Sequence, residues 1–243
     1  MRPFHPFLLL ALTAAVAAGA GCATGAREEA QDPAAVILDA RWEASLAAFA
    51  KADRERAPQP DGVLFVGSSS IRLWDKLEQQ FDMLPVVIKR GFGGSRMEDC
   101  AAYVDRLVLP YQPKLVLVYA GENDLAEGRT PQQVFDSFRR FAARVHEALP
   151  QTRIAYISIK PSPSRQWMAA GVRTANALIR SHAERSDRVQ YIDVHTPMLD
   201  EQGHPRAELF RDDALHLNDE GYALWKSVIL SRISEYAASA RRP

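Results

Sequence analysis

Five short runs of apolar residues, many of them β-branched, recur along the chain with helical patterns between them. The runs are predicted strands, and they cover residues 63–66, 86–89, 115–119, 153–159 and 189–194. Strands that alternate with helices form mostly parallel sheets, because a parallel connection has to cross from one end of the sheet to the other. We therefore predict an α/β protein, in which helices flank a five-stranded, mostly parallel sheet in a three-layer sandwich.

Between these runs, apolar residues recur at three- and four-residue spacing, which predicts amphipathic helices. The predicted helices cover residues 35–54, 71–81, 96–107, 131–149, 166–185 and 219–238. Asn218 directly precedes the last helix, where its side chain can serve as an N-cap. No repeat or low-complexity tract interrupts the pattern, so residues 35–243 are predicted to form one domain.

The first 21 residues differ from the rest and are typical of a bacterial export signal. Arg2 precedes an apolar run at residues 7–12, and an Ala/Gly-rich stretch follows it. The apolar part is shorter than the roughly 20 residues that a membrane-spanning helix needs. Residues 1–21 are therefore predicted to be a signal peptide that is removed during export to the cell envelope or periplasm.

Two processing sites remain open for this signal. Small residues stand directly before Cys22 and resemble a lipoprotein processing box, although the third residue before the cysteine is Gly19 instead of a Leu-like residue. In that case Cys22 carries lipid and residues 22–34 form a polar tether to the membrane. The alternative is cleavage after Ala15-Val16-Ala17, which gives a soluble secreted protein. The other cysteine, Cys100, is predicted to be a small buried thiol on a helix.

The charge balance excludes one class of partner. The chain has 30 basic and 30 acidic residues, and neither a basic stripe nor a basic patch with interleaved aromatic residues is present. The long-range field that attracts proteins to nucleic acid is therefore missing, and we predict no nucleic-acid partner. The only membrane contact expected is through the lipid anchor, and the sequence leaves the oligomeric state open.

Residue types that suit catalysis follow three of the predicted strands, at the point where each strand ends. Ser69, Gly94 and Asn123 occupy these positions. Carboxyl ends of parallel strands meet at one edge of a sheet, where ligands usually bind. Asp213 and His216 stand just before the last predicted helix, whose start faces the same edge. The sequence therefore predicts that the five residues converge.

Together these residues supply what acyl transfer needs, namely a nucleophile, a base, an orienting carboxylate and oxyanion donors. Ser69 lies at a strand-to-helix turn, which exposes a hydroxyl. Asp213 and His216 are three residues apart, so that the carboxylate can fix the imidazole tautomer. The Gly94 N–H and the Asn123 side-chain amide are predicted to stabilise the developing oxyanion.

The same segments resemble four sequence blocks of the SGNH, or GDSL-like, hydrolases. The matching segments are Gly67-Ser68-Ser69-Ser70, the glycine at Gly94, Gly121-Glu122-Asn123-Asp124 and Asp213-Ala214-Leu215-His216. Ser68 stands where the first block usually has Asp, so the nucleophile is assigned to Ser69 by alignment with the third position, with Ser68 and Ser70 as alternatives. Residues 63–74 and 90–95 also resemble the small bacterial acetylhydrolases of the platelet-activating-factor type.

The resemblance implies a flavodoxin-like SGNH hydrolase fold and a serine esterase that needs no cofactor and no metal. The absence of a long apolar insertion favours short acyl groups, acetyl above all, on a sugar, glycan or small-molecule alcohol. One alternative is a lysophospholipase or thioesterase that acts on longer acyl chains. Another is a non-catalytic, glycan-binding envelope protein on the same fold.

Several further residues near the predicted edge have competing interpretations. Asp124 is predicted to stabilise a turn, and His195 to form a pocket wall or lie on the surface. The segment that contains Arg165 and Trp167 follows the fourth predicted strand, so these two residues are candidates for substrate binding. The alternative is a rigid linker whose Trp167 packs inward.

Overall fold

The computed structural model describes residues 33–84 and 86–239, and its core is a five-stranded sheet in which every strand pair is parallel. The strand order is β2-β1-β3-β4-β5. The strands are β1 (Val63–Gly67), β2 (Val87–Gly91), β3 (Leu115–Tyr119), β4 (Arg153–Ile157) and β5 (Val189–Ile192). The predicted fold class is thereby confirmed. The predicted signal peptide and nearly all of the predicted tether lie outside the described residues.

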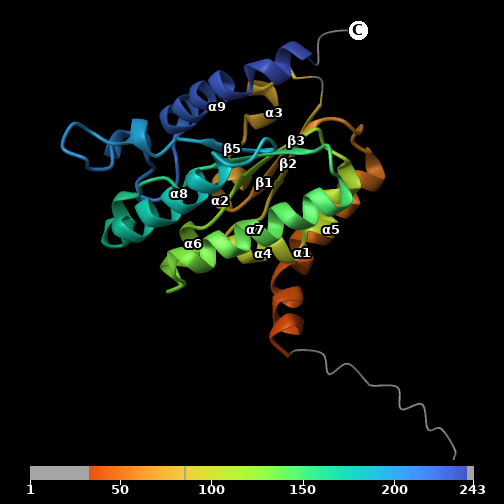
Figure 1. Ribbon diagram of the computed structural model, residues 1–243, viewed down its shortest axis with the longest axis horizontal. Helices are drawn as coiled ribbons and strands as arrows, with labels where there is room; N and C mark the ends of the chain where they lie inside the picture. The colour runs from red at the N-terminus through yellow and green to blue at the C-terminus, as the bar shows by residue number, and fades with distance from the viewer. Residues whose placement is uncertain (1–32, 85, 240–243) are drawn as a thin grey trace, which may run out of the picture.

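Helices cover both faces of the sheet (Figure 1). On one face lie α1 (Pro33–Glu55), α4 (Met97–Ala102), α5 (Val104–Leu107), α7 (Pro131–Ala148) and α8 (Ala169–Ala183). On the other lie α2 (Ser69–Arg72), α3 (Leu77–Gln80) and α9 (Asp219–Ser239). Successive strand side chains point to opposite faces, so Val66 joins the first core and Phe65 the second. Both faces are buried, which explains why the strands are continuous apolar runs.

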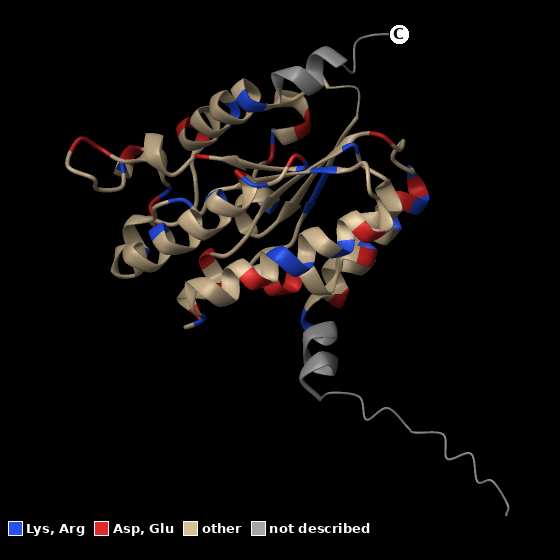
Figure 2. Cartoon of the chain, viewed as in Figure 1, with Lys and Arg blue, Asp and Glu red and all other residues tan. Residues whose placement is uncertain are grey.

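Acidic and basic residues are mixed along the fold, and Figure 2 shows both kinds interspersed over the described helices. This agrees with the equal numbers of acidic and basic residues in the sequence. Within the part of the chain that the structure describes, no helix combines the length and the apolar character that crossing a membrane requires.

The strand order indicates which edge of the sheet is suited to a binding site. The chain leaves β1 toward β2 on one side and later returns to place β3 on the other side of β1. Connections that leave adjacent strands in opposite directions open a binding site between them. Gly67 pairs in register with both Gly91 and Tyr119. The segments that carry Ser69, Gly94 and Asn123 therefore start from the same level of the sheet.

A sharp turn at Gly67 directs the chain out of β1. Gly67 has a φ of +144°, and a Cβ at this position would lie 1.9 Å from the Tyr119 carbonyl oxygen. The Ser68 N–H donates to the same oxygen at 3.0 Å. Only glycine allows this close approach of two strands, so the turn fixes Ser69 as the first residue of α2.

Two predicted helices are interrupted, and one helix was not predicted. The predicted helix at 71–81 is divided into α2 and α3. The segment between them leaves the helical path and buries Trp74 against Phe65, Phe81 and Tyr222. The predicted helix at 96–107 is divided into α4 and α5 at Tyr103.

The helix that was missed is α6 (Glu122–Ala126), which follows β3 directly. Short 3-10 helices occur at η1 (Leu109–Tyr111), η2 (Pro163–Met168), η3 (Thr196–Met198) and η4 (Ala207–Leu209).

The remaining elements agree with the predictions to within a few residues. The predicted start of α8 is replaced by η2, and β5 ends two residues early because the Val194 N–H donates to the Ser158 hydroxyl instead of to a strand. Asn218 is the N-cap of α9, since its side-chain oxygen accepts from the Gly221 N–H at 3.0 Å. Cys100 is fully buried on α4, as predicted.

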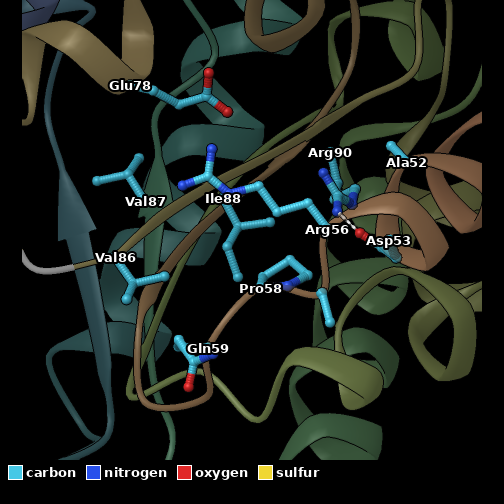
Figure 3. Close-up of a pocket in the computed structure, with 11 residues that line it drawn as sticks. Ala52, Asp53, Arg56, Pro58, Gln59, Glu78, Val86, Val87, Ile88 and Arg90 are labelled. Atoms are coloured by element: carbon cyan, nitrogen blue, oxygen red, sulfur yellow. Dashed lines mark hydrogen bonds and ion pairs between the residues drawn. The ribbon is translucent and has the colours of Figure 1, made fainter.

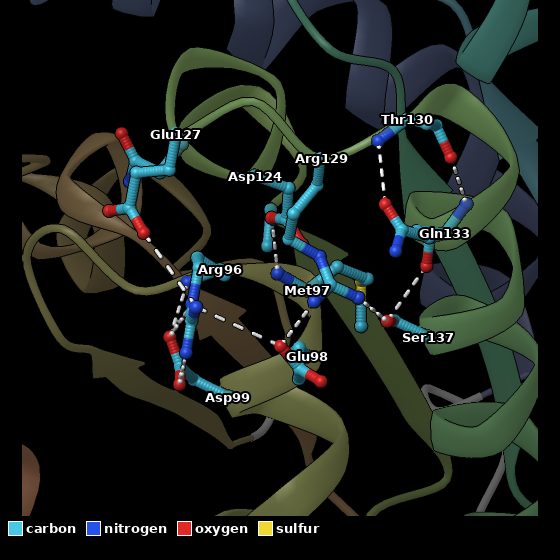
Figure 4. A network of polar contacts seen from close by, with 12 residues as sticks. Arg96, Met97, Glu98, Asp99, Asp124, Glu127, Arg129, Thr130, Gln133 and Ser137 are labelled. Atoms are coloured by element: carbon cyan, nitrogen blue, oxygen red, sulfur yellow. Dashed lines mark hydrogen bonds and ion pairs between the residues drawn. The ribbon is translucent and has the colours of Figure 1, made fainter. Parts of the chain in front are cut away.

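A network of charged side chains joins α4 to α6 and α7 (Figure 4). The Asp124 carboxylate accepts a hydrogen bond from the Met97 N–H at 2.7 Å. Arg129 donates to Glu98 at 2.5 Å, and its Nε lies 3.4 Å from Asp124 Oδ1. These contacts hold the start of α4 beside α6, in agreement with the structural role expected of Asp124. They also fix the distance between the segments that carry Gly94 and Asn123.

We predict that Asp124 makes stability fall as the pH rises. Burial raises the pKa of Asp124 to about 6, above the unfolded value of about 3.9. Its contribution is therefore fully present below about pH 4 and is lost as the pH rises to about 6. Asn has no charge to bury, so the unfolding free energy of Asp124→Asn should not fall in this way. Between pH 4 and pH 7, the difference between variant and wild type should shift by about 2–3 kcal/mol in favour of the variant, as measured by urea denaturation. An equal pH dependence in both proteins would contradict this account.

Candidate active site

Ser69, His216 and Asp213 form a continuous chain of hydrogen bonds. His216 Nε2 lies 3.1 Å from Ser69 Oγ, and His216 Nδ1 lies 2.6 Å from Asp213 Oδ2. Ser69 starts α2, whereas the other two residues belong to the loop before α9, 147 positions later in the case of His216. The structure thus brings together three residues that the sequence singled out for one reaction.

Hydrogen bonds to Asp213 keep it ionised and fix the histidine tautomer. Burial acts to raise the pKa of Asp213, but hydrogen bonds from the His216 N–H, the His216 ring and the Leu215 N–H outweigh it and lower the pKa to about 2. A carboxylate accepts only, so Nδ1 of His216 carries the proton. Nε2 therefore presents its lone pair to the Ser69 hydroxyl and can take up its proton.

Of the three consecutive serines, Ser69 is the one that contacts His216. Ser68 and Ser70 are buried, with exposed fractions of 3% and 2%, whereas Ser69 is partly exposed. The Ser70 carbonyl accepts from the Tyr222 hydroxyl, which anchors the turn to α9. The geometry therefore favours Ser69 over both alternatives.

The loop that carries Asp213 and His216 is closed by backbone contacts. An antiparallel bridge joins Phe210 to Leu217, and the Arg211 N–H donates to the His216 carbonyl at 2.8 Å. Ala214, at the tip, has a φ of +53°. Its carbonyl accepts from both the N–H and the hydroxyl of Ser164, at 3.1 and 3.0 Å. The histidine is therefore held by a rigid loop that is also tied to η2.

Gly94 supplies a free N–H in a conformation that favours glycine. Its φ is +85°, and a Cβ there would meet only ordinary contacts, at 3.7 Å from Trp42 and 3.9 Å from Arg41. Glycine is thus required by the backbone conformation more than by lack of space. Among the described residues, no acceptor receives a hydrogen bond from the N–H of Gly94 or of Ser69. Both donors remain available to a ligand.

The Asn123 side chain is fixed in one orientation by two partners of opposite type. Its Nδ2 donates to the Ser95 carbonyl at 3.0 Å, and its Oδ1 accepts from Arg165 Nη1, also at 3.0 Å. A carbonyl cannot donate and a guanidinium cannot accept, so a flipped amide would lose both bonds. The second Nδ2 hydrogen remains free to act as an oxyanion donor.

Arg165 and Trp167, the two candidate substrate-binding residues, have different environments. Arg165 contacts Asn123 and lies 3.7 Å from Glu122 Oε1. Trp167 is 71% exposed, so the alternative in which it packs inward is wrong. Because Trp167 is exposed, it remains a predicted substrate-binding residue.

A buried polar cluster next to Asn123 was not predicted from the sequence. Lys160 Nζ donates to Glu122 Oε2 at 2.7 Å and to the Ser162 hydroxyl at 2.5 Å. Glu122 accepts two further hydrogen bonds. One comes from the Ser162 hydroxyl to Oε1 at 2.5 Å, and the other from the Tyr119 hydroxyl to Oε2 at 2.9 Å. Burial acts to raise the pKa of Glu122, but the charges of Lys160 and Arg165 outweigh it and lower the pKa. The available signal was the position of Glu122 and Lys160 just after two neighbouring strands.

Of two cavities in the structure, one is remote from the candidate catalytic residues and the other is next to Arg165. A cavity of about 770 Å³ lies beside the edge strand β2 and the end of α1, where Arg90 pairs with Asp53, and none of the catalytic candidates lines it (Figure 3). A smaller cavity lies next to Arg165, and His195 forms part of its wall, as predicted. Within the described residues, no group of three or more His, Cys, Asp or Glu side chains is arranged to hold a metal ion.

Comparison with known proteins identifies the family. Residues 60–224 match the model of the GDSL-like Lipase/Acylhydrolase family. A comparison with curated protein sequences finds no significant match.

Solved structures share the fold at low sequence identity. One, described as a platelet activating factor from Streptococcus pneumonia, is 19% identical with a TM-score of 0.68, covering 85% of this chain and 99% of that chain. A GDSL-like lipase from Bacteroides thetaiotaomicron is 20% identical with a TM-score of 0.65, covering 81% and 97%. A catalytic mutant of the acetylxylan esterase Axe2 from Geobacillus stearothermophilus is 13% identical with a TM-score of 0.61, covering 72% and 95%.

The family match covers more than half of the chain, including the segments of Ser69, Gly94, Asn123 and His216. The resemblance to the SGNH hydrolases is confirmed, and the chain belongs to the GDSL-like lipase/acylhydrolase family of carboxylic ester hydrolases.

Proposed function

We propose that the protein is a serine esterase that removes short acyl groups through an acyl-serine intermediate, with Ser69 as nucleophile, His216 as base and Asp213 as orienting carboxylate. The observation that carries the proposal is the hydrogen-bond chain from Ser69 Oγ through His216 to Asp213. Free N–H donors next to this chain support it, because a tetrahedral intermediate needs them.

In the proposed reaction, Ser69 Oγ attacks the ester carbonyl carbon while its proton passes to His216 Nε2. The carbonyl oxygen becomes an oxyanion, which accepts hydrogen bonds from the N–H groups of Ser69 and Gly94 and from Asn123 Nδ2. The C–O bond to the alcohol breaks as His216 returns the proton to the leaving oxygen. Water, deprotonated by His216, then hydrolyses the acyl-serine and regenerates Ser69.

Short acyl groups are favoured by the surroundings of Ser69. Ser69 lines neither the large cavity beside β2 nor the smaller cavity next to Arg165, so neither of them can hold a fatty chain that is attached to Ser69. The structural similarity to an acetylxylan esterase is consistent with acetyl as the acyl group. For the alcohol half, we propose a sugar, a glycan or a small molecule.

An assay with p-nitrophenyl esters tests the acyl preference and the catalytic residues. We expect kcat/KM to fall from acetate through butyrate to palmitate. Ser69→Ala and His216→Ala should each remove most of the turnover of the acetate, and the double variant should be little worse than either, because such residues act as a unit. A folded Ser69→Ala variant with near wild-type turnover would refute the mechanism. A preference for palmitate would instead indicate an enzyme for long acyl chains.

A second prediction concerns Arg165 as a positioning residue for Asn123. Asn123→Ala should lower kcat by about 10²–10³. With the uncharged substrate p-nitrophenyl acetate, Arg165→Met should lower kcat with little change in KM, because the amide is then free to rotate, and Arg165→Lys should restore part of the loss. In the Asn123→Ala background, Arg165→Met should have no further effect, because Arg165 acts through that amide. Equal losses in both backgrounds would show that Arg165 acts by another route.

We also propose that the protein is exported and that Cys22 is its acylated first residue. The small residues before Cys22 and the polar stretch after it support this proposal. Mass spectrometry of membrane-extracted protein should find a lipid-modified N-terminus at Cys22. An unmodified N-terminus upstream of Cys22 would instead support a soluble secreted protein.

A further inference from the structure

A small cavity lies beside the candidate active site, between two connections that follow neighbouring strands. One wall comes from the segment after β4 and the first turn of α8, and the other comes from the segment after β5. Its lining includes Lys160, Arg165, Arg173 and His195. Ser69, Asp213 and His216 do not line it. The cavity is therefore a neighbour of the site, and the proposed mechanism does not use it.

The charges around the cavity are unbalanced. Three of the lining side chains are cations, Lys160, Arg165 and Arg173, and none of the lining residues is an Asp or Glu. Glu122 is the carboxylate in contact with two of them, since it hydrogen-bonds Lys160 at 2.7 Å and lies 3.7 Å from Arg165. The charges of Asp213 and Asp193 also act on Lys160 and His195, but these two carboxylates are bound to His216 and Arg180.

Arg173 lacks even this compensation. It is exposed on α8, and no ion pair or hydrogen bond joins it to another of the described residues. The cavity also lies at the first turn of α8, which spans Ala169–Ala183, so the positive end of the helix dipole adds to the same field. The surplus of positive charge indicates that the cavity suits an anionic group.

The size of the cavity limits which groups can enter. Its volume is about 90 Å³. A water molecule occupies about 30 Å³ in the liquid, and an engineered cavity of about 150 Å³ binds benzene. The space therefore fits one compact group, such as a carboxylate or a phosphate, and is too small for a sugar ring.

Arg165 connects the cavity to the reacting centre. Its guanidinium donates to Asn123 Oδ1 at 3.0 Å, and the same side chain lines the cavity. An ester whose carbonyl oxygen lies at the Asn123 amide is thus separated from the cavity by one guanidinium group. An acetyl group extends only a methyl beyond the carbonyl carbon and cannot bridge this gap. The alcohol half of the ester can.

We propose that this cavity is a subsite for an anionic group on the alcohol half of the ester, so that the enzyme prefers acyl esters of acidic alcohols. Arg173 and Arg165 bind the anion from two sides. The proposal rests on the esterase function proposed above and adds the charge of the substrate to it.

Matched pairs of acetyl esters test the preference. The acetyl ester of lactate is compared with that of lactamide, and acetylated glycerol phosphate with acetylated glycerol. In at least one pair, kcat/KM should be about ten-fold higher for the anion, because a hydrogen bond to a charged group contributes at least that factor. The pair with the larger ratio identifies the anion as carboxylate or phosphate. Ratios within two-fold of one in both pairs would overturn the proposal.

Arg173→Gln tests the site, with Arg139→Gln as the matched control. Arg139 lies on α7, is 60% exposed and does not line the cavity, so its loss changes the net charge equally. Arg173→Gln should bring the anionic-to-neutral ratio of kcat/KM close to one, whereas Arg139→Gln should leave it at the wild-type value. Equal effects of the two variants would mean that the preference comes from overall charge, and would refute a subsite.

A binding measurement separates failure of the subsite from failure of the esterase function. Inorganic phosphate is titrated into the wild-type protein and both variants by calorimetry. Binding that Arg173→Gln weakens at least ten-fold and Arg139→Gln leaves unchanged supports the cavity even if no ester is hydrolysed. If p-nitrophenyl acetate is hydrolysed but phosphate does not bind and no charge preference is found, the subsite is refuted while the esterase stands.

Discussion

The register of β1 with its two neighbours, β2 and β3, is the constraint on which the candidate site depends. Gly67 is paired with both Gly91 and Tyr119, and the Tyr119 carbonyl accepts the Ser68 N–H. A side chain at Gly67 would collide with that carbonyl, so the turn after β1 exists only because glycine stands there. From this fixed level, three segments leave the sheet and bring Ser69, Gly94 and Asn123 to the same edge.

Electrostatics then orient what the sheet has brought together. Asp213 remains charged and holds the His216 tautomer, while Ser95 and Arg165 hold the Asn123 amide. Arg165 itself lies near Glu122, whose buried charge is balanced mainly by Lys160. Donors that are oriented before the substrate arrives need no reorganisation during the reaction, which is the main source of their catalytic effect. The buried cluster therefore helps to hold Arg165 in place, and Arg165 in turn holds Asn123.

Much of this arrangement was predictable, because it follows from periodicity and from residues at strand ends. Five apolar runs separated by amphipathic patterns are sufficient to predict a parallel sheet, and with it the edge where Ser69 and Asn123 meet. The interruption of the helix at Trp74 was not predictable, because Trp74 packs against Tyr222 and Trp225, which are distant in sequence. Local patterns carry no information on such contacts.

The partners of Asn123 were missed for the same reason. Arg165 lies 42 positions from Asn123, and Lys160 lies 38 positions from Glu122. The sequence was sufficient to predict that Arg165 lies at the same edge of the sheet as Asn123. It did not reveal that Arg165 contacts the Asn123 side chain. Side-chain pairing across two loops depends on rotamers and burial, which only the folded structure specifies.

Covalent labelling of the nucleophile tests the account most directly. A fluorophosphonate reacts with a serine only where a base removes its proton and free donors stabilise the charge on the phosphoryl oxygen, so it probes the whole constellation in one step. Mass spectrometry with fragmentation of the labelled peptide should place one adduct on Ser69, and none should form in Ser69→Ala. An adduct on Ser68 or Ser70, or labelling that persists in a folded Ser69→Ala variant, would contradict the assignment.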